Sequence, residues 1–231
     1  MIRIAAGTTS PLVRDVVLFD LDGTVLDTHD AILDSMRYAT RKVLNRVIPD
    51  EVLLAEVGQP LVTQMRTFAP DEETAQELLV AYRSRNEVDL DQKTAPFSGI
   101  EQLVRALKNK GFTVAVVTSK REVLASESLK SFGMYDLFAR VNGMESSAGH
   151  KPDPDPLLQA AKDLRVSTDR CMYIGDSPYD LQAANAAHIP CVGVTWGKFF
   201  GREVLEPEHP AFLVNSMDEL HQAILTLAQA K

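Results

Sequence analysis

Long apolar runs are absent from this 231-residue sequence. No stretch approaches the roughly 18 consecutive apolar residues that a membrane-spanning helix requires, so we expect a soluble protein with no membrane partner. The first residues, 1–14, also lack the features of a secretory signal, because the apolar segment Ile4-Ala5-Ala6 is too short for one. We interpret these residues as a short tail.

Cysteine is scarce. Cys171 and Cys191 each lie in an apolar, strand-like run, where a thiol usually behaves as a small buried hydrophobic group. This usage fits a reduced, cytoplasmic setting. A disulfide between the two stays open at this stage, because neighbouring strands could bring them close. Internal repeats and low-complexity segments are also absent.

The sequence has no excess of positive charge. Acidic residues number 32 against 24 lysines and arginines, which gives a formal net charge of -8. This field would repel a phosphate backbone unless a local basic patch outweighed it, so we expect no nucleic-acid partner. The content of 45% hydrophobic and 24% charged residues is ordinary for a globular protein. The length suits one large α/β domain or a core domain with a smaller one attached.

The most informative stretch of the sequence is residues 16–28. Residues 16–19 are β-branched, aliphatic and aromatic, the pattern of a strand buried on both faces of a parallel sheet. Asp20 and Asp22 follow directly, and because strand side chains alternate, both carboxylates can point to one side beyond the strand's carboxyl end. Open α/β sheets bind their ligands at that edge. Gly23 allows the sharp turn that follows.

Two interpretations of this acidic pair are open. Carboxylates this close repel each other, so each resists ionisation unless a cation lies between them, which suggests a hard metal such as Mg²⁺. Taken alone, however, Asp-Leu-Asp-Gly is also explained as an acidic turn that closes a strand. The rest of the chain decides between them.

Helical periodicity without a strand-like run follows the first strand. The apolar spacing predicts helices over residues 30–47, 51–57, 61–68 and 71–91, with a loop at Gly58-Gln59-Pro60. We therefore predict a small all-helical domain over residues 27–96. It would be inserted into a core domain made of residues 1–26 and 97–231.

From residue 97 helices alternate with strands, which predicts βαβ units and an α/β fold with a Rossmann-like parallel sheet. The apolar runs predict strands over residues 112–118, 137–142, 170–175 and 190–195, and an edge strand over 211–214. The amphipathic segments predict helices over residues 99–110, 121–132, 156–164 and 179–187, and a last helix opened by the capping box Ser216-Met217-Asp218-Glu219.

Polar groups suited to phosphate chemistry follow the predicted strands. Thr118-Ser119 precedes a helix, where a hydroxyl and free N–H groups could face one anion, although such a pair is also a common helix cap. Lys151 lies in the proline-held segment 150–154, although a loop lysine is usually solvated. Asp176 and Asp180 are placed to share a cation at a strand-to-helix turn, or to serve separately as a helix cap and a surface acid.

Together these pieces resemble the haloacid dehalogenase superfamily of phosphohydrolases. The matching motifs, in order, are Asp20-Leu21-Asp22-Gly23-Thr24, Thr118-Ser119, Lys151, and Gly175-Asp176 with Asp180. The resemblance extends from about residue 15 to residue 219. The helical insertion resembles the cap of the phosphoglycolate phosphatase-like branch, which includes pyrophosphatases and β-phosphoglucomutases. Segments 96–99 and 151–154 also resemble that branch.

The resemblance implies a phosphatase that hydrolyses a small phosphorylated metabolite through an aspartyl-phosphate. Asp20 would be the nucleophile. Asp22 would protonate the leaving oxygen and then take a proton from water. Thr118 and Lys151 would hold the phosphoryl oxygens, and Ser119 would add its backbone N–H.

The resemblance also implies Mg²⁺ as the cofactor. Asp20, the backbone carbonyl of Asp22, and Asp176 would hold the ion, with Asp180 binding it directly or through water. The acid at Asp22 separates this chain from the dehalogenases of the superfamily, because a phosphoester leaving group needs a proton and a halide does not. His188 stands where the family pattern has glycine, and a left-handed conformation there would cost roughly 1 kcal/mol.

Several functions stay open within this family. Gln59 and Arg66 are the residues that we expect the cap to contribute to substrate binding, although Arg66 could simply be solvated on its helix. Phosphoglycolate and inorganic pyrophosphate are the leading substrate candidates, and the core motifs do not separate a phosphatase from a phosphomutase. A non-catalytic binding protein is disfavoured because Asp20 and Asp22 are both present. We expect a monomer or a homodimer.

Overall fold

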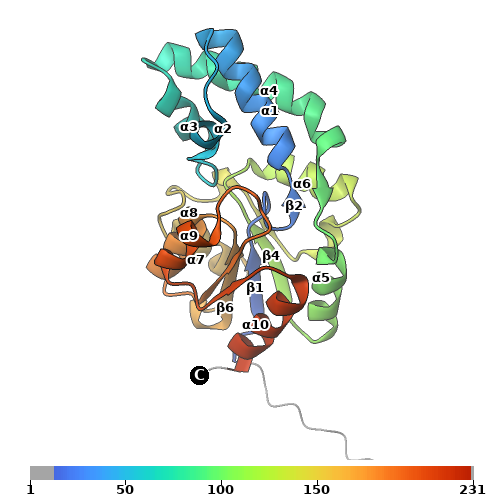
Figure 1. Ribbon diagram of the computed structural model, residues 1–231. Coiled ribbons are helices and arrows are strands. Elements are labelled where there is room, and N and C mark those ends of the chain that lie inside the picture. The colour runs from blue at the N-terminus through green and yellow to red at the C-terminus, as the bar shows by residue number, and fades with distance from the viewer. Residues whose placement is uncertain (1–12, 230–231) are drawn as a thin grey trace, which may run out of the picture.

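A computed structural model describes residues 13–229, apart from the side chains of residues 89–91, and shows a six-stranded sheet between two layers of helices (Figure 1). The strands are β1 Val16–Phe19, β4 Thr113–Val117, β5 Val141–Asn142, β6 Cys171–Gly175, β7 Cys191–Val194 and β8 Phe212–Val214. They lie in the order β5-β4-β1-β6-β7-β8, and every neighbouring pair is parallel. The predicted Rossmann-like α/β fold is confirmed. Most of the predicted tail lies outside the described residues.

Strand β1 lies at the centre of the sheet, between β4 and β6. Its side chains alternate as the sequence predicts: Val17 and Phe19 join the apolar core on one face, and Val16 and Leu18 join the core on the other. All four are fully buried. Burying side chains of this size stabilises the fold by roughly 1.5–3 kcal/mol each, so this strand anchors the residues that follow it.

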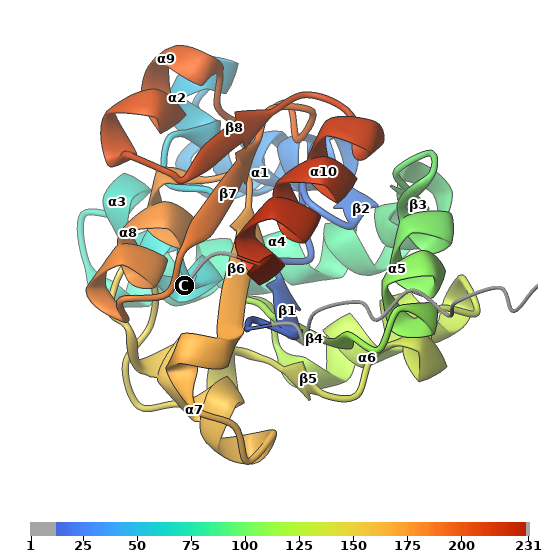
Figure 2. The same cartoon turned by 90° about the horizontal axis from the view of Figure 1, so that it is seen from below.

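Helices cover both faces of the sheet (Figure 2). One face is covered by α5 Ile100–Asn109, α6 Glu122–Ser131 and α10 Met217–Gln229, and the other by α7 Asp155–Asp163, α8 Pro178–Ala186 and α9 Arg202–Leu205. Short 3-10 turns occur at Tyr135–Leu137, Met144–Ser146, Thr168–Arg170 and Glu206–Glu208. The sequence predicted all these helices except α9, within a few residues of their bounds.

The prediction of a strand over residues 137–142 is wrong in its first half. Val141 and Asn142 form strand β5 beside β4, and the Ala139 N–H donates to the carbonyl of Val114, whereas Leu137 ends a 3-10 turn. Leu137 and Phe138 are apolar because they pack into the core from that turn. The predicted capping box is half formed: Ser216 accepts from the Glu219 N–H at 3.3 Å, but the Glu219 carboxylate accepts from the N–H of Asn215.

Four helices form a layer of their own above the sheet in Figure 1. They are α1 His29–Leu44, α2 Asp50–Leu54, α3 Leu61–Phe68 and α4 Glu72–Lys93. Their apolar side chains form a third core, separate from the two on the sheet. The chain enters and leaves this layer through two short antiparallel strands, β2 Leu26–Asp27 and β3 Ala95–Pro96. The helical layer therefore lies over the carboxyl ends of the central strands.

Cys171 and Cys191 are both free and buried, so the disulfide that the sequence left open is not formed. Burial raises the pKa of each thiol to about 11. His188 has a φ of 56°, which confirms the left-handed conformation expected after α8. Across residues 13–229, each helix is too short or too polar to span a bilayer.

Candidate active site

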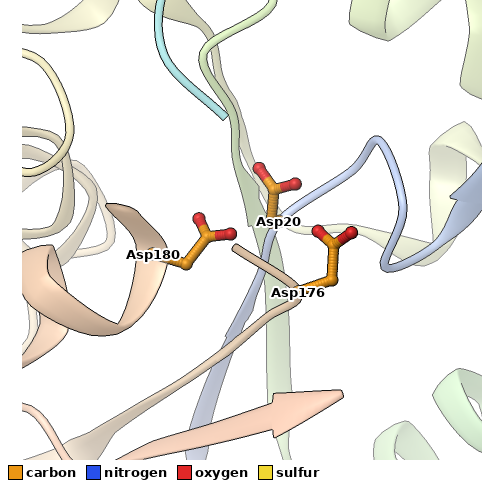
Figure 3. Close-up of side chains that lie close together, drawn as sticks. All are labelled: Asp20, Asp176 and Asp180. Atoms are coloured by element: carbon orange, nitrogen blue, oxygen red, sulfur yellow. The ribbon is translucent and has the colours of Figure 1, made fainter. Parts of the chain in front are cut away.

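Three carboxylates from the ends of β1 and β6 meet at one point (Figure 3). Asp20 follows β1, and its backbone N–H donates to the carbonyl of Ile174 in β6 at 2.8 Å. Asp176 follows β6, and Asp180 lies in the first turn of α8. One oxygen of each carboxylate lies within 4.8 Å of the others, and all three residues are buried. The fold thus gathers acids that lie up to 160 positions apart in the sequence.

Lys151 supplies a buried positive charge beside this cluster. Its Nζ lies 2.8 Å from Asp20 Oδ1 and 2.6 Å from Asp180 Oδ1, and its side chain is 1% exposed. Burial lowers the pKa of the ammonium, but the carboxylates of Asp180 and Asp20 outweigh burial and raise it. Lys151 is therefore charged and fixed in place below Asp20.

Tyr173 is a site residue that sequence reasoning missed. Its hydroxyl lies 2.7 Å from Lys151 Nζ, 2.9 Å from Asp180 Oδ1 and 3.0 Å from the carbonyl of Val117. Burial, together with the charges of Asp180 and Asp20, raises the pKa of this phenol well above its usual value, so it stays neutral. An aromatic residue inside a buried strand looks like an ordinary core residue, so no sequence signal could have found it.

Both oxygens of Asp180 are already used within the protein. Oδ1 accepts from Lys151 and Tyr173, and Oδ2 accepts from the Ser177 N–H at 3.0 Å and from the Ser177 hydroxyl at 2.6 Å. The Ser177 N–H contact, together with the Asp180 N–H that donates to the Ser177 hydroxyl oxygen, forms the capping box that begins α8. In this arrangement Asp180 orients Lys151, and direct ligation of a metal would replace one of its hydrogen bonds.

Asp176 is different, because one of its oxygens has no partner. Oδ1 accepts from the Thr24 hydroxyl at 3.3 Å, whereas Oδ2 is buried and accepts no hydrogen bond within the described residues. Burial, and then the charges of Asp180 and Asp20, raises the pKa of Asp176 well above its usual value. Burial likewise raises the pKa of Asp20 to about 7, against the effect of Lys151.

This donor set fits a hard divalent cation. A buried carboxylate oxygen without a donor is costly, and a cation at the cluster would satisfy it. It would also reverse the raised pKa values, because a nearby positive charge favours the ionised carboxylates. Oxygen ligands of this kind are those that Mg²⁺ takes in proteins.

Asp22 lies in a separate environment from Asp20. Its Oδ1 lies 2.9 Å from the Nζ of Lys120, and the two side chains are 19% and 11% exposed. Each aspartate of the first motif therefore has its own lysine, Lys151 for Asp20 and Lys120 for Asp22. Lys120 directly follows Thr118-Ser119, so the rule that strand ends carry the site could have predicted it.

A cavity of about 130 Å³ lies between the strand ends and the helical layer. The sheet side contributes Asp20, Asp22, Thr118, Ser119, Lys120 and Asp176, and the helical side contributes Gln59, Gln64, Tyr82 and Arg83. Lys151 and Asp180 lie beneath this surface and act through the residues above them. The cavity thus exposes two acids from the end of β1 and one from the end of β6, together with hydroxyl and cationic side chains.

The comparisons with known proteins agree with this geometry. Residues 17–194 match the family described as haloacid dehalogenase-like hydrolase. The chain belongs to this family. It is 36% identical over 208 residues to a protein of Caldanaerobacter subterraneus subsp. tengcongensis named "Putative pyrophosphatase PpaX", covering 90% of this chain and 93% of that protein.

Other members of this hydrolase family give the same result. A phosphoglycolate phosphatase of Neisseria meningitidis is 32% identical over 217 residues, which cover 89% of this chain and 92% of that protein. The crystal structure of a "predicted phosphatase" from Clostridium acetobutylicum matches with a TM-score of 0.83 and 33% identity, over 94% of this chain and 100% of that one. The expected family is therefore confirmed, and this hydrolase is a phosphatase.

The loop between α2 and α3 connects the helical layer of the hydrolase to its active site through close contacts. Ser119 donates from its hydroxyl to the Gly58 carbonyl at 2.6 Å, and Tyr179 donates to the Glu56 carboxylate at 2.7 Å. Gly58 has a φ of 106°, and a Cβ there would lie 2.6 Å from the Ser177 hydroxyl oxygen. Only glycine therefore allows this close approach.

Arg66 does not reach the active site of the hydrolase, contrary to the prediction. Its guanidinium pairs with Glu72 at 2.8 Å on the surface, and its side chain is 55% exposed. The buried face of α3 carries Gln64 and Met65, so Arg66 points outward. The cationic side chain that the helical layer contributes to the cavity is Arg83 of α4, which the sequence analysis did not select.

Proposed function

We propose that this hydrolase is a Mg²⁺-dependent phosphatase that transfers a phosphoryl group to Asp20 and then to water. The observation that carries the proposal is the environment of the Asp20 carboxylate. It lies at a strand end in a cluster with Asp176 and Asp180, 2.8 Å from the ammonium of Lys151, on the wall of a small cavity. A nucleophilic carboxylate needs this setting, in which neighbouring positive charge lets it approach an anionic phosphate.

In the first half-reaction an oxygen of Asp20 attacks phosphorus, and the bond from phosphorus to the leaving oxygen breaks. Asp22 gives its proton to the leaving oxygen, which departs as a neutral hydroxyl or a protonated oxyanion. Asp22 lies on the cavity wall, whereas the oxygens of Asp180 are occupied below it, so Asp22 is the acid within reach of the leaving group.

In the second half-reaction Asp22 takes a proton from water. The water oxygen attacks phosphorus, the bond from phosphorus to Asp20 breaks, and inorganic phosphate forms with both aspartates restored. Thr118 lines the cavity, and its hydroxyl oxygen accepts from the Lys120 N–H at 3.2 Å. The Thr118 proton is then directed to a phosphoryl oxygen, whose charge it stabilises.

Asp20 and Asp176 are the residues that we propose to hold Mg²⁺, together with the backbone carbonyl of Asp22. Asp180 would act from the outer shell, because its oxygens hold Lys151 and Ser177. When bound, the cation neutralises charge between the nucleophile and the phosphate. Lys151 favours the ionised form of the Asp20 carboxylate and orients it for attack on phosphorus.

We propose further that residues 27–96 act as a cap on a core made of residues 1–26 and 97–231. The cap closes the cavity over the strand ends and excludes water during phosphoryl transfer. Gln59 lines the cavity from the cap loop, where its amide donates to the Glu56 carboxylate. The cap would therefore select the leaving group.

The substrate that we propose is a small phosphate compound whose leaving group carries its own negative charge. An apolar cavity of roughly 150 Å³ admits benzene, so a cavity of about 130 Å³ suits a leaving group of a few atoms. Lys120 and Arg83 line it with positive charge, while Arg121 pairs with Glu145 at 3.2 Å. Phosphoglycolate is the first candidate.

Inorganic pyrophosphate is the second candidate, and the relative named as a pyrophosphatase at 36% identity favours it. Its leaving group, phosphate, is also small and anionic. We propose a cytoplasmic location for the enzyme, in keeping with the free thiols of Cys171 and Cys191.

The test is phosphate release from phosphoglycolate, pyrophosphate, p-nitrophenyl phosphate and sugar phosphates, with Mg²⁺ and with a chelator. We expect release that requires Mg²⁺ and falls more than about 1,000-fold in Asp20→Asn. Asp30→Asn makes the same chemical change at a side chain that is 75% exposed, and should keep full activity. Mg²⁺-independent release, or an active Asp20→Asn variant, would contradict the mechanism. Isomerisation of a sugar phosphate without phosphate release would indicate a mutase.

A further inference from the structure

The segment Trp196-Gly197-Lys198-Phe199 lies between β7 and α9. It contacts the carboxylate cluster, the cap, and the two crossings, which are the points where the chain enters and leaves the cap. We propose that this segment, called the strut below, positions Asp176 and the cap together, so that cation binding and cap closure are coupled. The inference rests on the metal site proposed above. It goes beyond that site by assigning positioning residues that lie outside the four motifs.

Gly197 forms the contact with the carboxylate cluster. A Cβ on Gly197 would lie 2.0 Å from Asp176 Oδ2 and 2.7 Å from the carbonyl oxygen of Gly23. A Cβ on Gly23 would also lie 2.0 Å from the same Asp176 oxygen. Asp176 therefore lies between two glycines, one in the turn after β1 and one in the strut. Only residues without a side chain allow both backbones to approach this closely.

Trp196 connects the strut to the chain around both crossings. Its indole N–H donates to the carbonyl of Thr24, just before β2, at 3.2 Å. Its ring meets the ring of Phe97, just after β3, edge to face, with centroids 6.3 Å apart and an angle of 61°. Aromatic pairs favour this geometry, and a buried indole N–H needs an acceptor. One side chain therefore holds the points where the chain enters and leaves the cap.

Lys198 adds a contact on the first crossing. Its Nζ lies 2.6 Å from Asp27 Oδ2 in β2, and the hydrogen bond raises the pKa of the ammonium. The Lys198 side chain is 54% exposed, so the ion pair contributes little to stability. Its main effect is to orient the strut relative to β2. Lys198 also has a φ of 68°, an unusual conformation for a residue with a side chain.

Phe199 reaches the cap. Its ring packs against the apolar core of the four cap helices and lies 5.4 Å from the ring of His29, the first residue of α1. The next residue, Phe200, packs instead against the core on one face of the sheet. The chain is therefore fixed to the cap at one residue and to the core domain at the next.

These contacts make the strut a short, packed connection from Asp176 to the cap. Packed interiors transmit displacement because they contain little free space. When a cation draws the Asp176 carboxylate toward Asp20, the contact between this carboxylate and Gly197 changes. The strut would transmit that displacement to Phe97, Asp27 and His29. By linkage, the factor by which cation binding shifts the equilibrium of cap closure equals the factor by which cap closure changes the cation affinity.

The first experiment uses the single tryptophan of the chain, so that intrinsic fluorescence reports the strut alone. Mg²⁺ is titrated into the metal-free full-length protein while emission is recorded, and binding is measured independently by calorimetry. We expect a saturable change in Trp196 emission with the midpoint found by calorimetry. Asp176→Asn should abolish both.

The second experiment changes the end of the strut that is remote from the cluster. Phe199→Ala should weaken Mg²⁺ affinity by at least about fivefold, since coupling between sites is commonly of that size or larger. Phe68→Ala is the matched control, because Phe68 packs on the same cap core from α3. It should leave Mg²⁺ affinity unchanged. Circular dichroism confirms that both variants are folded.

The outcomes separate the strut from the metal site. Mg²⁺ binding with unchanged emission, and equal affinity in wild type and Phe199→Ala, would overturn the coupling and leave the metal site standing. Absence of Mg²⁺ binding to the wild-type protein would overturn the metal site, and the coupling with it. Equal weakening by Phe199→Ala and Phe68→Ala would show a general effect of cap stability and would also overturn the strut.

Discussion

Lys120 contacts Asp22, 98 positions earlier in the chain, at 2.9 Å between Nζ and Oδ1. This pair lies on the wall of the cavity that Asp20 also lines. Lys120 can therefore act in two ways. It holds Asp22 in place, and it attracts a negatively charged leaving group. Both follow from the same charge, and they can be separated by the choice of substrate.

Replacing Lys120 by Gln is expected to lower kcat/KM for phosphoglycolate and pyrophosphate by about 10- to 100-fold, the equivalent of one charge-assisted hydrogen bond. The loss with phenyl phosphate, whose leaving group is neutral once protonated, should be smaller. Steady-state phosphate release measures both. Lys130→Gln, a change at the end of α6, is the control and should match wild type. Equal losses on all substrates would assign Lys120 to positioning Asp22 alone.

Arg83→Gln is expected to lower kcat/KM for anionic leaving groups by about tenfold, because one cation is lost from the cavity wall. Activity on p-nitrophenyl phosphate should change little. Arg41→Gln makes the same change on the exposed side of α1 and should have no effect. A loss that is the same for neutral and anionic leaving groups would remove Arg83 from substrate recognition.

Asp22→Asn should separate the two half-reactions. With p-nitrophenyl phosphate, whose leaving group departs without a proton, Asp20 can still be phosphorylated, but water is no longer deprotonated. We expect a burst of about one equivalent of p-nitrophenol followed by turnover that is slower than wild type by about 100- to 10,000-fold. Stopped-flow absorbance measures the burst, and Asp20→Asn should show none. A linear trace at the wild-type rate would exclude Asp22 as the base.

The stabilisation by Mg²⁺ should increase with pH. Burial raises the pKa of Asp20 to about 7 and that of Asp176 well above its usual value, whereas both ionise near pH 4 in the unfolded chain. Between these values the folded, metal-free protein binds more protons than the unfolded chain, so this cluster makes stability fall as pH rises. Mg²⁺ requires the ionised form and removes that loss.

Differential scanning calorimetry with and without saturating Mg²⁺ tests this dependence. The rise in Tm on adding Mg²⁺ should be small near pH 5 and larger near pH 8, because protons compete with the cation for the same carboxylates. In Asp20→Asn the dependence should be weaker. A rise in Tm that is the same at both pH values would show that the carboxylates are not protonated in the metal-free protein.

The sequence by itself determined the sheet and the position of the chemistry. The run from Val16 to Phe19 is apolar at every position, the pattern of a strand that is covered on both faces. The acids directly after this run must therefore lie at the carboxyl edge of the sheet. The same local logic applies to Thr118, Asp176 and Lys151. Short-range patterns of this kind are sufficient because strand and helix periodicity is set by neighbouring residues.

Only the tertiary structure decided how these groups pair. Lys151 contacts Asp20 and Lys120 contacts Asp22, and neither pairing follows from spacing in the chain. The rotation of α3 directs Arg66 to solvent, while α4 brings Arg83 to the cavity, because the buried face of each helix depends on what packs against it. Tyr173 and Gly197 became site residues for the same reason: their local sequence is that of a core strand and a loop, and their partners lie far away in the chain.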